Sequence, residues 1–269
     1  NYAVTLSNLG CESEAEPLKR EYLDLRRKTL GAEHPSSLAA LNSYAMSLSK
    51  LGREGEAEPL KRECLDLHRK AFGPEHPKTL VALGSYASTV GSLGREGEAE
   101  PLKRECLEIS RRILGSEHPG TLTALSTYAL TLSRLGREGE AKPLRWECLD
   151  MSRRTLGTEH PNTLTALNNY AVTLSNLGCE GEAEPWRWAC LEISRKALGE
   201  EHPGTLTALN NYSVTLSNLG REGEAKLLRL ECLEMSRRIL GKEHPGTLTA
   251  LNNYAVTLSN LGCEVEAEP

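Results

Sequence analysis

The hydrophobic and polar residues follow a helical period over residues 161–177. The apolar residues there recur at spacings of three and four, and they are Leu164, Leu167, Tyr170, Ala171, Leu174 and Leu177. This spacing predicts one apolar stripe on a helix, which we call helix A. Pro161 suits the first turn of this helix, where a missing N–H group costs nothing.

A second helical pattern, helix B, follows after a turn that Gly178 and Gly181 bracket. Helix B is expected from about Glu182 to Gly199, with Pro185 in its first turn, where proline is tolerated. Its apolar stripe is Ala183, Trp186, Cys190, Leu191 and Ile193. The start of helix B is acidic and its end is basic, an order that complements the helix dipole.

This two-helix unit repeats along the whole chain. The tripeptide Glu-His-Pro recurs every 42 residues, at 33–35, 75–77, 117–119, 159–161, 201–203 and 243–245. We therefore predict an all-α fold, a right-handed α-solenoid of antiparallel helix pairs, because stacked units bury a face that one unit cannot bury alone. The predicted array spans 1–269, with partial repeats at 1–32 and 243–269 and full repeats at 33–74, 75–116, 117–158, 159–200 and 201–242.

The unit resembles a known repeat. The run EAEPLKRECLEISRRILGSEHPGTLTAL (98–125) and the run LNNYA (167–171) are similar to the 42-residue tetratricopeptide repeat of kinesin light chains and nephrocystin-like proteins. The resemblance covers the whole chain and rests on the small Ala in EAE, the Glu-His-Pro linker and the Asn-Asn-aromatic-Ala run of helix A. One position departs from the pattern: the aromatic residue usual just after the glycine between the helices is Glu here, as at Glu180.

Composition excludes several classes of protein. The 269 residues carry a formal charge of −5, which argues against general electrostatic binding to nucleic acid or to a membrane surface. No run approaches 18 apolar residues, so no transmembrane helix is expected. The eight cysteines contain no Cys-x-x-Cys motif. Five of them share one helix B position and are interpreted as small buried residues, and such free thiols favour a reducing, cytoplasmic compartment.

No residue pattern indicates catalysis, a metal or a cofactor. The six histidines of the Glu-His-Pro motif have no second ligand at metal-binding spacing, and equivalent residues of adjacent units should lie about 10 Å apart. We interpret these histidines as residues that shape the turn from helix B to helix A. No phosphate-binding loop or nucleophile motif is present. We therefore expect a protein that is not an enzyme.

Helix A is almost free of charge. Residues 162–178, 204–220 and 246–262 contain no Asp, Glu, Lys or Arg. The resemblance implies that helix A lines a concave groove, which would then be neutral. Three explanations stay open: a peptide lies in the groove, another protein packs on it, or tight winding of the superhelix buries it within the chain.

Asparagine pairs on helix A are the candidate peptide-binding residues. They are Asn168, Asn169, Asn210, Asn211, Asn252 and Asn253, with Asn42 as a partial copy. In the family that the chain resembles, asparagines at this place grip an extended peptide backbone. An amide both donates and accepts, so it can pair with a peptide group without reading its side chain.

The three tryptophans form a second candidate surface. Trp146 and Trp188 share one helix B position in successive units, and Trp186 replaces a leucine. Aromatic anchors are typical of binding hot spots. The alternative explanation is simple packing of tryptophan over neighbouring helices.

These observations favour a non-catalytic scaffold that binds an extended peptide or a partner protein along the Asn/Thr/Ser-lined groove. The alternative hypothesis is a structural protein that assembles end to end into a filament or a larger complex, because neither end carries a polar capping helix. A second copy of the chain is then a further candidate partner.

Overall fold

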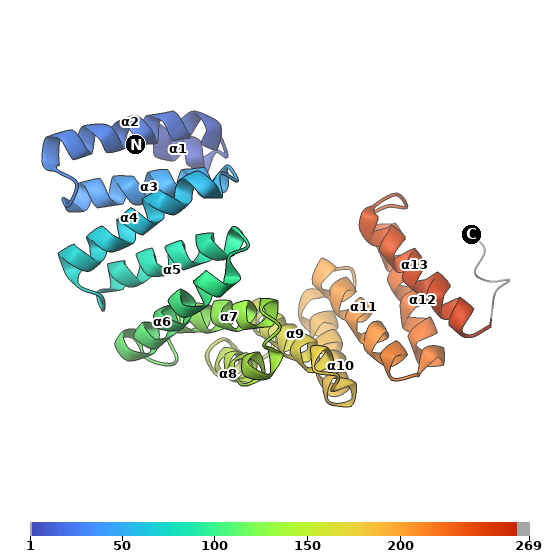
Figure 1. The fold of residues 1–269 in the computed structure, drawn as a ribbon. Coiled ribbons are helices and arrows are strands. Elements are labelled where there is room, and N and C mark those ends of the chain that lie inside the picture. The colour runs from blue at the N-terminus through green and yellow to red at the C-terminus, as the bar shows by residue number, and fades with distance from the viewer. Residues whose placement is uncertain (1, 263–269) are drawn as a thin grey trace. The chain divides into compact units, whose positions relative to one another are not determined.

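A computed structural model describes residues 2–262 of the chain, and every secondary-structure element in that range is an α-helix. The helices form two compact units, Asn1–Gly136 (unit 1) and Arg137–Pro269 (unit 2). Each helix in a unit packs against the next one along the chain, so the predicted α-solenoid of helix pairs is confirmed (Figure 1). The repeated segment at 263–269 lies outside the described residues.

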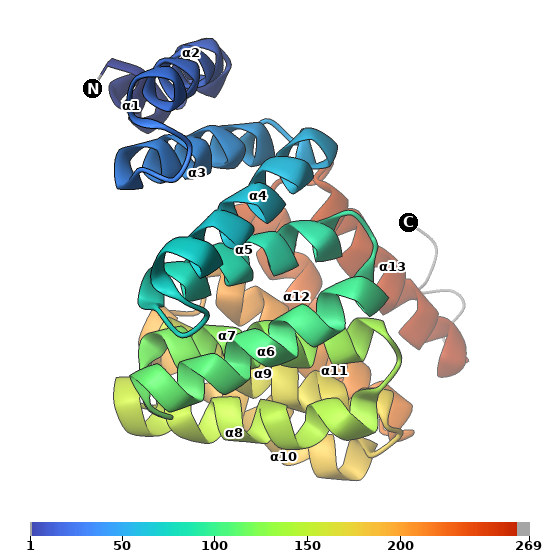
Figure 2. The same ribbon diagram turned by 60° about the vertical axis from the view of Figure 1, so that its left-hand side comes forward.

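Unit 1 contains seven helices within the described residues. They are α1 (Tyr2–Asn8), α2 (Glu12–Leu30), α3 (Pro35–Lys50), α4 (Glu54–Phe72), α5 (Pro77–Ser92), α6 (Glu96–Leu114) and α7 (Pro119–Arg134). The odd-numbered helices are helix A of a repeat and the even-numbered ones are helix B. Helix α4 contacts α3 on one side and α5 on the other, as both views show (Figure 1 and Figure 2).

Unit 2 continues the alternation with six described helices. They are α8 (Glu138–Leu156), α9 (Pro161–Asn176), α10 (Glu180–Leu198), α11 (Pro203–Asn218), α12 (Glu222–Ile239) and α13 (Pro245–Asn260). Consecutive helices pack together from α8 through to α13. From α3 to α13, each A helix begins at the proline of a Glu-His-Pro motif, as the sequence predicts.

The histidine of the Glu-His-Pro motif is the N-cap of each A helix from α3 to α13. His202 is the N-cap of α11, and its Nδ1 accepts a 3.0 Å hydrogen bond from the backbone N–H of Gly204. This bond satisfies one of the helix-end donors that would otherwise lack a partner. The hydroxyl of Thr205 donates to the carbonyl of Gly199 at 2.7 Å and ties the helix to the preceding turn. Gly199 has φ 92°, a conformation that favours glycine. The predicted role of the histidines in the turn is confirmed.

The turn from helix A to helix B corrects two details of the prediction. Leu177 was expected on the apolar stripe, but it is the C-cap of α9 and is 37% exposed. Helix α10 begins at Glu180, two residues earlier than expected, so Pro185 lies in the second turn and not the first. The helix continues through Pro185, which is exposed. Proline has no N–H group to donate to the carbonyl one turn earlier. Because the position is exposed, water can bond to that carbonyl instead.

The core of each unit lies between the apolar stripes of the A and B helices. In unit 2, Leu167, Leu174 and Leu191 are buried to 1% exposure or less. Leucine loss at such positions costs about 2–5 kcal/mol, because the cavity collapses only in part. The repeated helix B cysteines share this core: Cys64, Cys148, Cys190 and Cys232 are buried and Cys106 is half-buried, and none of them forms a disulfide.

Candidate functional site

The A helices of unit 2 present an uncharged face. Helices α9, α11 and α13 contain no Asp, Glu, Lys or Arg. Thr165, Thr207 and Thr249 are exposed at one position of this face, and each hydroxyl donates to the carbonyl of the proline that opens its own helix. The described side chains on the face are therefore small, neutral and already partly hydrogen-bonded.

Two amide–amide hydrogen bonds link the asparagines of neighbouring A helices. Asn211 Nδ2 on α11 donates to Asn168 Oδ1 on α9 at 2.9 Å. Asn253 Nδ2 on α13 donates to Asn210 Oδ1 on α11 at 3.1 Å. The second asparagine of each pair thus reaches the first asparagine of the preceding pair. We call these four residues the Asn ladder.

A buried arginine fixes the orientation of one step of the Asn ladder. Arg187 on α10 is 6% exposed, and its Nη1 donates to Asn168 Oδ1 at 2.7 Å. A guanidinium can only donate, so the acceptor atom of Asn168 is its oxygen, and Asn211 must present its nitrogen. The free groups are then an N–H pair on Asn168 and an oxygen on Asn211.

Arg187 belongs to a column of buried basic residues, one in each described B helix. None of these residues was singled out from the sequence. In unit 1 the column consists of lysines with a carboxylate nearby; the Nζ of Lys19 is 2.7 Å from Glu12 and that of Lys103 is 3.5 Å from Glu96. In unit 2 it consists of Arg145, Arg187 and Arg229, whose Nε atoms have no hydrogen-bond partner among the described residues. Burial lowers the pKa of these three guanidinium groups from the usual value. The available signal was the strict 42-residue spacing of a basic residue that stands two positions after the helix B proline, or after Leu227 in α12.

The remaining predicted asparagines lie outside the Asn ladder. Asn169 is half-buried and Asn252 is exposed. Asn42 lies in unit 1 on α3, where its Nδ2 approaches Met46 Sδ at 3.6 Å.

The tryptophans divide into two contacts. Trp146 and Trp186 lie 5.6 Å apart between ring centroids, and both rings touch Tyr170, at 5.4 and 5.6 Å. Trp188 packs on Tyr212 instead, at 5.6 Å. Trp146 and Trp188 stay 43% and 46% exposed, so part of each ring is open to a partner. Offset and edge-on ring contacts of this kind also stabilise the fold by about 0.5–1.5 kcal/mol each.

Other candidate chemistry is sparse in the part of the chain that the structure describes. No group of three His, Cys, Asp or Glu side chains there could hold a metal ion. Between Tyr2 and Gly262, no helix has the length and apolar character to cross a membrane. The Nδ1 atoms of the Glu-His-Pro histidines already accept the cap hydrogen bonds of the A helices.

Comparisons with solved structures support the architecture. A putative kinesin light chain with nearly identical TPR-like repeats from Podosopora anserina is 26% identical, with a TM-score of 0.70 over 77% of this chain and 98% of that one. BtubC (BKLC) from P. vanneervenii is 18% identical, with a TM-score of 0.61 over 85% and 87% of the two chains. YrrB, described as a TPR protein with an unusual peptide-binding site, is 16% identical, with a TM-score of 0.55 over 85% and 96%. The last two show a shared fold only.

Family models identify the repeats directly. One tetratricopeptide repeat model matches residues 1–70, 37–111 and 87–144, and a second matches 163–204 and 205–246. A comparison with curated proteins gave no match. The repeat is generally a non-catalytic scaffold for protein–protein interaction. The chain belongs to the tetratricopeptide repeat family, and its repeats are similar to those of kinesin light chains.

Proposed function

We propose that the chain is a non-catalytic scaffold whose unit 2 binds an extended peptide along the face of α9, α11 and α13. The observation that carries this proposal is the Asn ladder, whose hydrogen bonds leave one face of each amide free. Asn168 and Asn210 keep N–H donors without a partner among the described residues, and Asn211 and Asn253 keep oxygen acceptors.

The free groups suit a peptide backbone. An extended chain offers C=O and N–H groups in alternation, and the ladder offers donors and acceptors in each repeat. The amides are held by one another and by Arg187, so little side-chain entropy remains to be lost on binding. The face carries no charge that a ligand would have to desolvate. Peptide recognition would then depend on backbone contacts more than on ligand charge.

The test is selection of binders from a phage-displayed library of random 12-residue peptides on the full chain, followed by titration of one selected peptide. We expect Asn211→Ala and Asn253→Ala each to weaken binding about five-fold, because a neutral hydrogen bond contributes about 1 kcal/mol. Asn169→Ala removes an amide that bonds to no other described residue and tests the face without disturbing the ladder.

The chain supplies a matched control in Asn218→Ala. Asn218 is the last residue of α11, and its Nδ2 donates to Glu180 at 2.7 Å rather than to the ladder. Unchanged peptide affinity in Asn169→Ala, Asn211→Ala and Asn253→Ala would eliminate the ladder as a binding site. End-to-end assembly remains the alternative prediction, and a molar mass that rises with concentration in light scattering would support it.

A further inference from the structure

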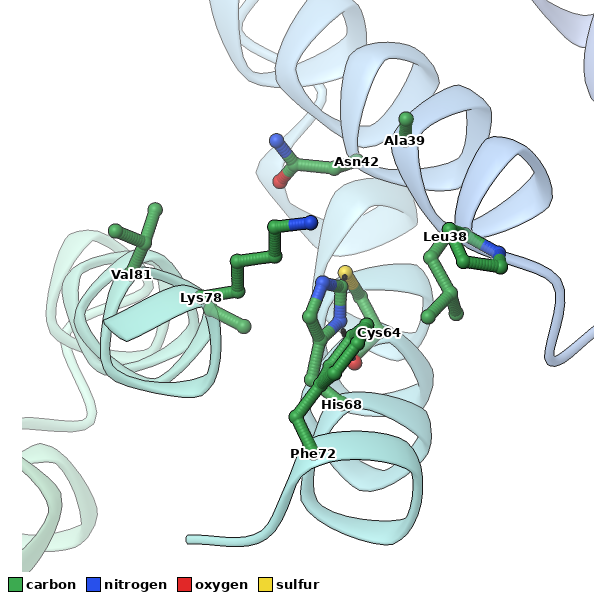
Figure 3. Close-up of a pocket in the computed structure, with 10 residues that line it drawn as sticks. Leu38, Ala39, Asn42, Cys64, His68, Phe72, Lys78 and Val81 are labelled. Carbon is green, nitrogen blue, oxygen red and sulfur yellow. Dashed lines mark hydrogen bonds between the residues drawn. The ribbon is translucent and has the colours of Figure 1, made fainter. Parts of the chain in front are cut away.

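A cavity in unit 1 lies apart from the Asn ladder. It has a volume of about 210 Å³ and lies between α3, α4 and α5 (Figure 3). Leu38, Phe72 and Val81 supply apolar walls, and Asn42, His68 and Lys78 supply polar atoms. In the close-up, the Lys78 amine lies between the Asn42 amide and the His68 ring.

Four of the side chains that line the cavity differ from those of most other repeats. His68 stands where repeats further along the chain have serine, Phe72 where all the others have leucine, and Val81 where most have threonine. Lys78 stands where the other repeats have Ser, Gly or Asn. All four of these side chains line one cavity, although they come from two different helices. This set of four side chains therefore occurs once in the chain.

The aromatic wall favours a flat ligand. The His68 and Phe72 rings lie 5.7 Å apart between centroids, and Phe72 stacks on His76 at 4.8 Å. His68 Nδ1 lies 2.7 Å from the Cys64 carbonyl oxygen and donates to it, which fixes the ring in the wall. An apolar cavity of about 150 Å³ can take up benzene, so a cavity of about 210 Å³ has room for one ring and a short substituent.

The charge of the cavity favours an anion. Among the described residues that line the cavity, Lys78 is the one cation and none is Asp or Glu. The Lys78 amine lies 5.2 Å from the centroid of the Phe72 ring. A ring packed on Phe72 would therefore carry its substituent close to an ammonium group that forms no ion pair with a described residue. A charge-assisted hydrogen bond there would be about twice as strong as a neutral one.

We propose that this cavity binds a small aromatic monocarboxylate, with its ring between Phe72, Leu38 and Val81 and its carboxylate at Lys78 Nζ and the Asn42 amide. The cavity combines apolar walls with a few convergent polar groups, as small-molecule sites do. The site is independent of the peptide face proposed for unit 2. A ligand here would bridge three consecutive helices, and it would stabilise unit 1 by mass action.

The test measures binding of phenylacetate and of its neutral analogue 2-phenylethanol to the full chain by calorimetry. We expect saturable phenylacetate binding at one site. Lys78→Met should weaken it about ten-fold through loss of the charged hydrogen bond and should leave 2-phenylethanol binding unchanged.

A second variant returns the cavity to the residues of a later repeat: His68→Ser, Phe72→Leu, Lys78→Gly and Val81→Thr. Ser194, Leu198, Gly204 and Thr207 occupy these positions in unit 2, so the variant should fold, and it should lose phenylacetate binding. Asn211→Ala should bind phenylacetate as the unmodified chain does. The proposal is overturned if phenylacetate shows no saturable binding, or if Lys78→Met and the four-residue variant bind it as tightly as the unmodified chain.

Discussion

Arg187 on α10 donates a 2.7 Å hydrogen bond to the side-chain oxygen of Asn168 on α9, so a buried guanidinium is held by an amide. The same oxygen accepts from Asn211, which places three side chains from three helices in one hydrogen-bonded group. A buried charge is costly unless its donors are satisfied. Asn168 therefore stabilises the fold at the same atom that orients the proposed peptide-binding face.

A double-mutant cycle measures this relationship. Asn168→Ala leaves the buried guanidinium without its acceptor and should lower the free energy of unfolding by about 1–3 kcal/mol. Arg187→Met keeps much of the apolar volume and removes the charge, so it should cost less than about 1 kcal/mol. In the Arg187→Met background, Asn168→Ala should then cost little. Urea unfolding of the unmodified chain, the two single variants and the double variant gives the four free energies of unfolding. Additive effects of the two substitutions would show that Asn168 and Arg187 do not stabilise each other.

Ser37 offers a stabilising substitution. Its hydroxyl is buried and has no hydrogen-bond partner between residues 2 and 262. The threonines at the same position of later repeats donate to the preceding glycine carbonyl at 2.7–2.8 Å. Ser37→Thr should restore this bond to Gly31 and raise the free energy of unfolding by about 0.5–1.5 kcal/mol. Thr205→Ser in unit 2 is the reciprocal control and should be destabilising. A lower melting temperature for Ser37→Thr would show that the first turn cannot accommodate the threonine methyl group.

The cysteines should differ in their reactivity. Burial raises the pKa of the Cys64 thiol to about 11 and also raises the pKa of Cys190 and Cys232. Cys11 is exposed and Cys179 is half-buried. Brief treatment of the native chain with iodoacetamide at pH 8 should therefore label Cys11 and Cys179 before the buried thiols, as peptide mass spectrometry would measure. Labelling of Cys64 as fast as Cys11 would show that α4 opens readily.

The sequence predicts the helices of this fold more completely than its side-chain partners. A strict 42-residue period determines which residues face the core, and Leu167 and Leu174 are buried as predicted. Helix boundaries are less certain, because the acidic first turn of α10 can begin at Glu180 although Pro185 follows in the second turn.

The sequence predicts which asparagines belong to the candidate site, but it does not predict the hydrogen bonds that join them. The asparagine pairs are visible in the sequence, but the bond from Asn211 to Asn168 spans 43 positions and depends on how α9 and α11 pack. Arg187 was not identified from the sequence, because arginine is seldom buried. The cavity at His68 was not predicted, because the sequence contains one non-periodic histidine and does not show that it lies beside Phe72, Lys78 and Val81.

The stability of the first repeat should depend on pH through Glu12. This buried carboxylate accepts from Lys19 at 2.7 Å, from Ser7 at 3.1 Å and from Ser47. Burial acts to raise its pKa, but the hydrogen bonds from Lys19, Ser47 and Ser7 outweigh this effect and lower the pKa from 4.5 to about 2. A carboxyl whose pKa is lower in the folded state binds more protons when unfolded. The ionised Glu12 carboxylate therefore contributes fully to the free energy of unfolding above pH 4.5, and this contribution is lost as the pH falls to about 2.

Glu12→Gln removes the charge and should lower the stability of α2 by about 2 kcal/mol at neutral pH, as for a hydrogen bond to a charged group. The difference in free energy of unfolding between Glu12→Gln and the unmodified chain should shrink steadily below pH 4.5 and vanish near pH 2. Urea titrations at a series of pH values, followed through the methyl resonances of the buried Leu23 in α2, would measure it. Glu14→Gln, at an exposed position of the same turn, is the matched control and should leave the pH dependence unchanged. Acid removes only the stabilisation that the ionised carboxylate provides. If the free energies of unfolding of Glu12→Gln and the unmodified chain differed by a constant amount from pH 2 to 7, the charge of Glu12 would not stabilise the repeat.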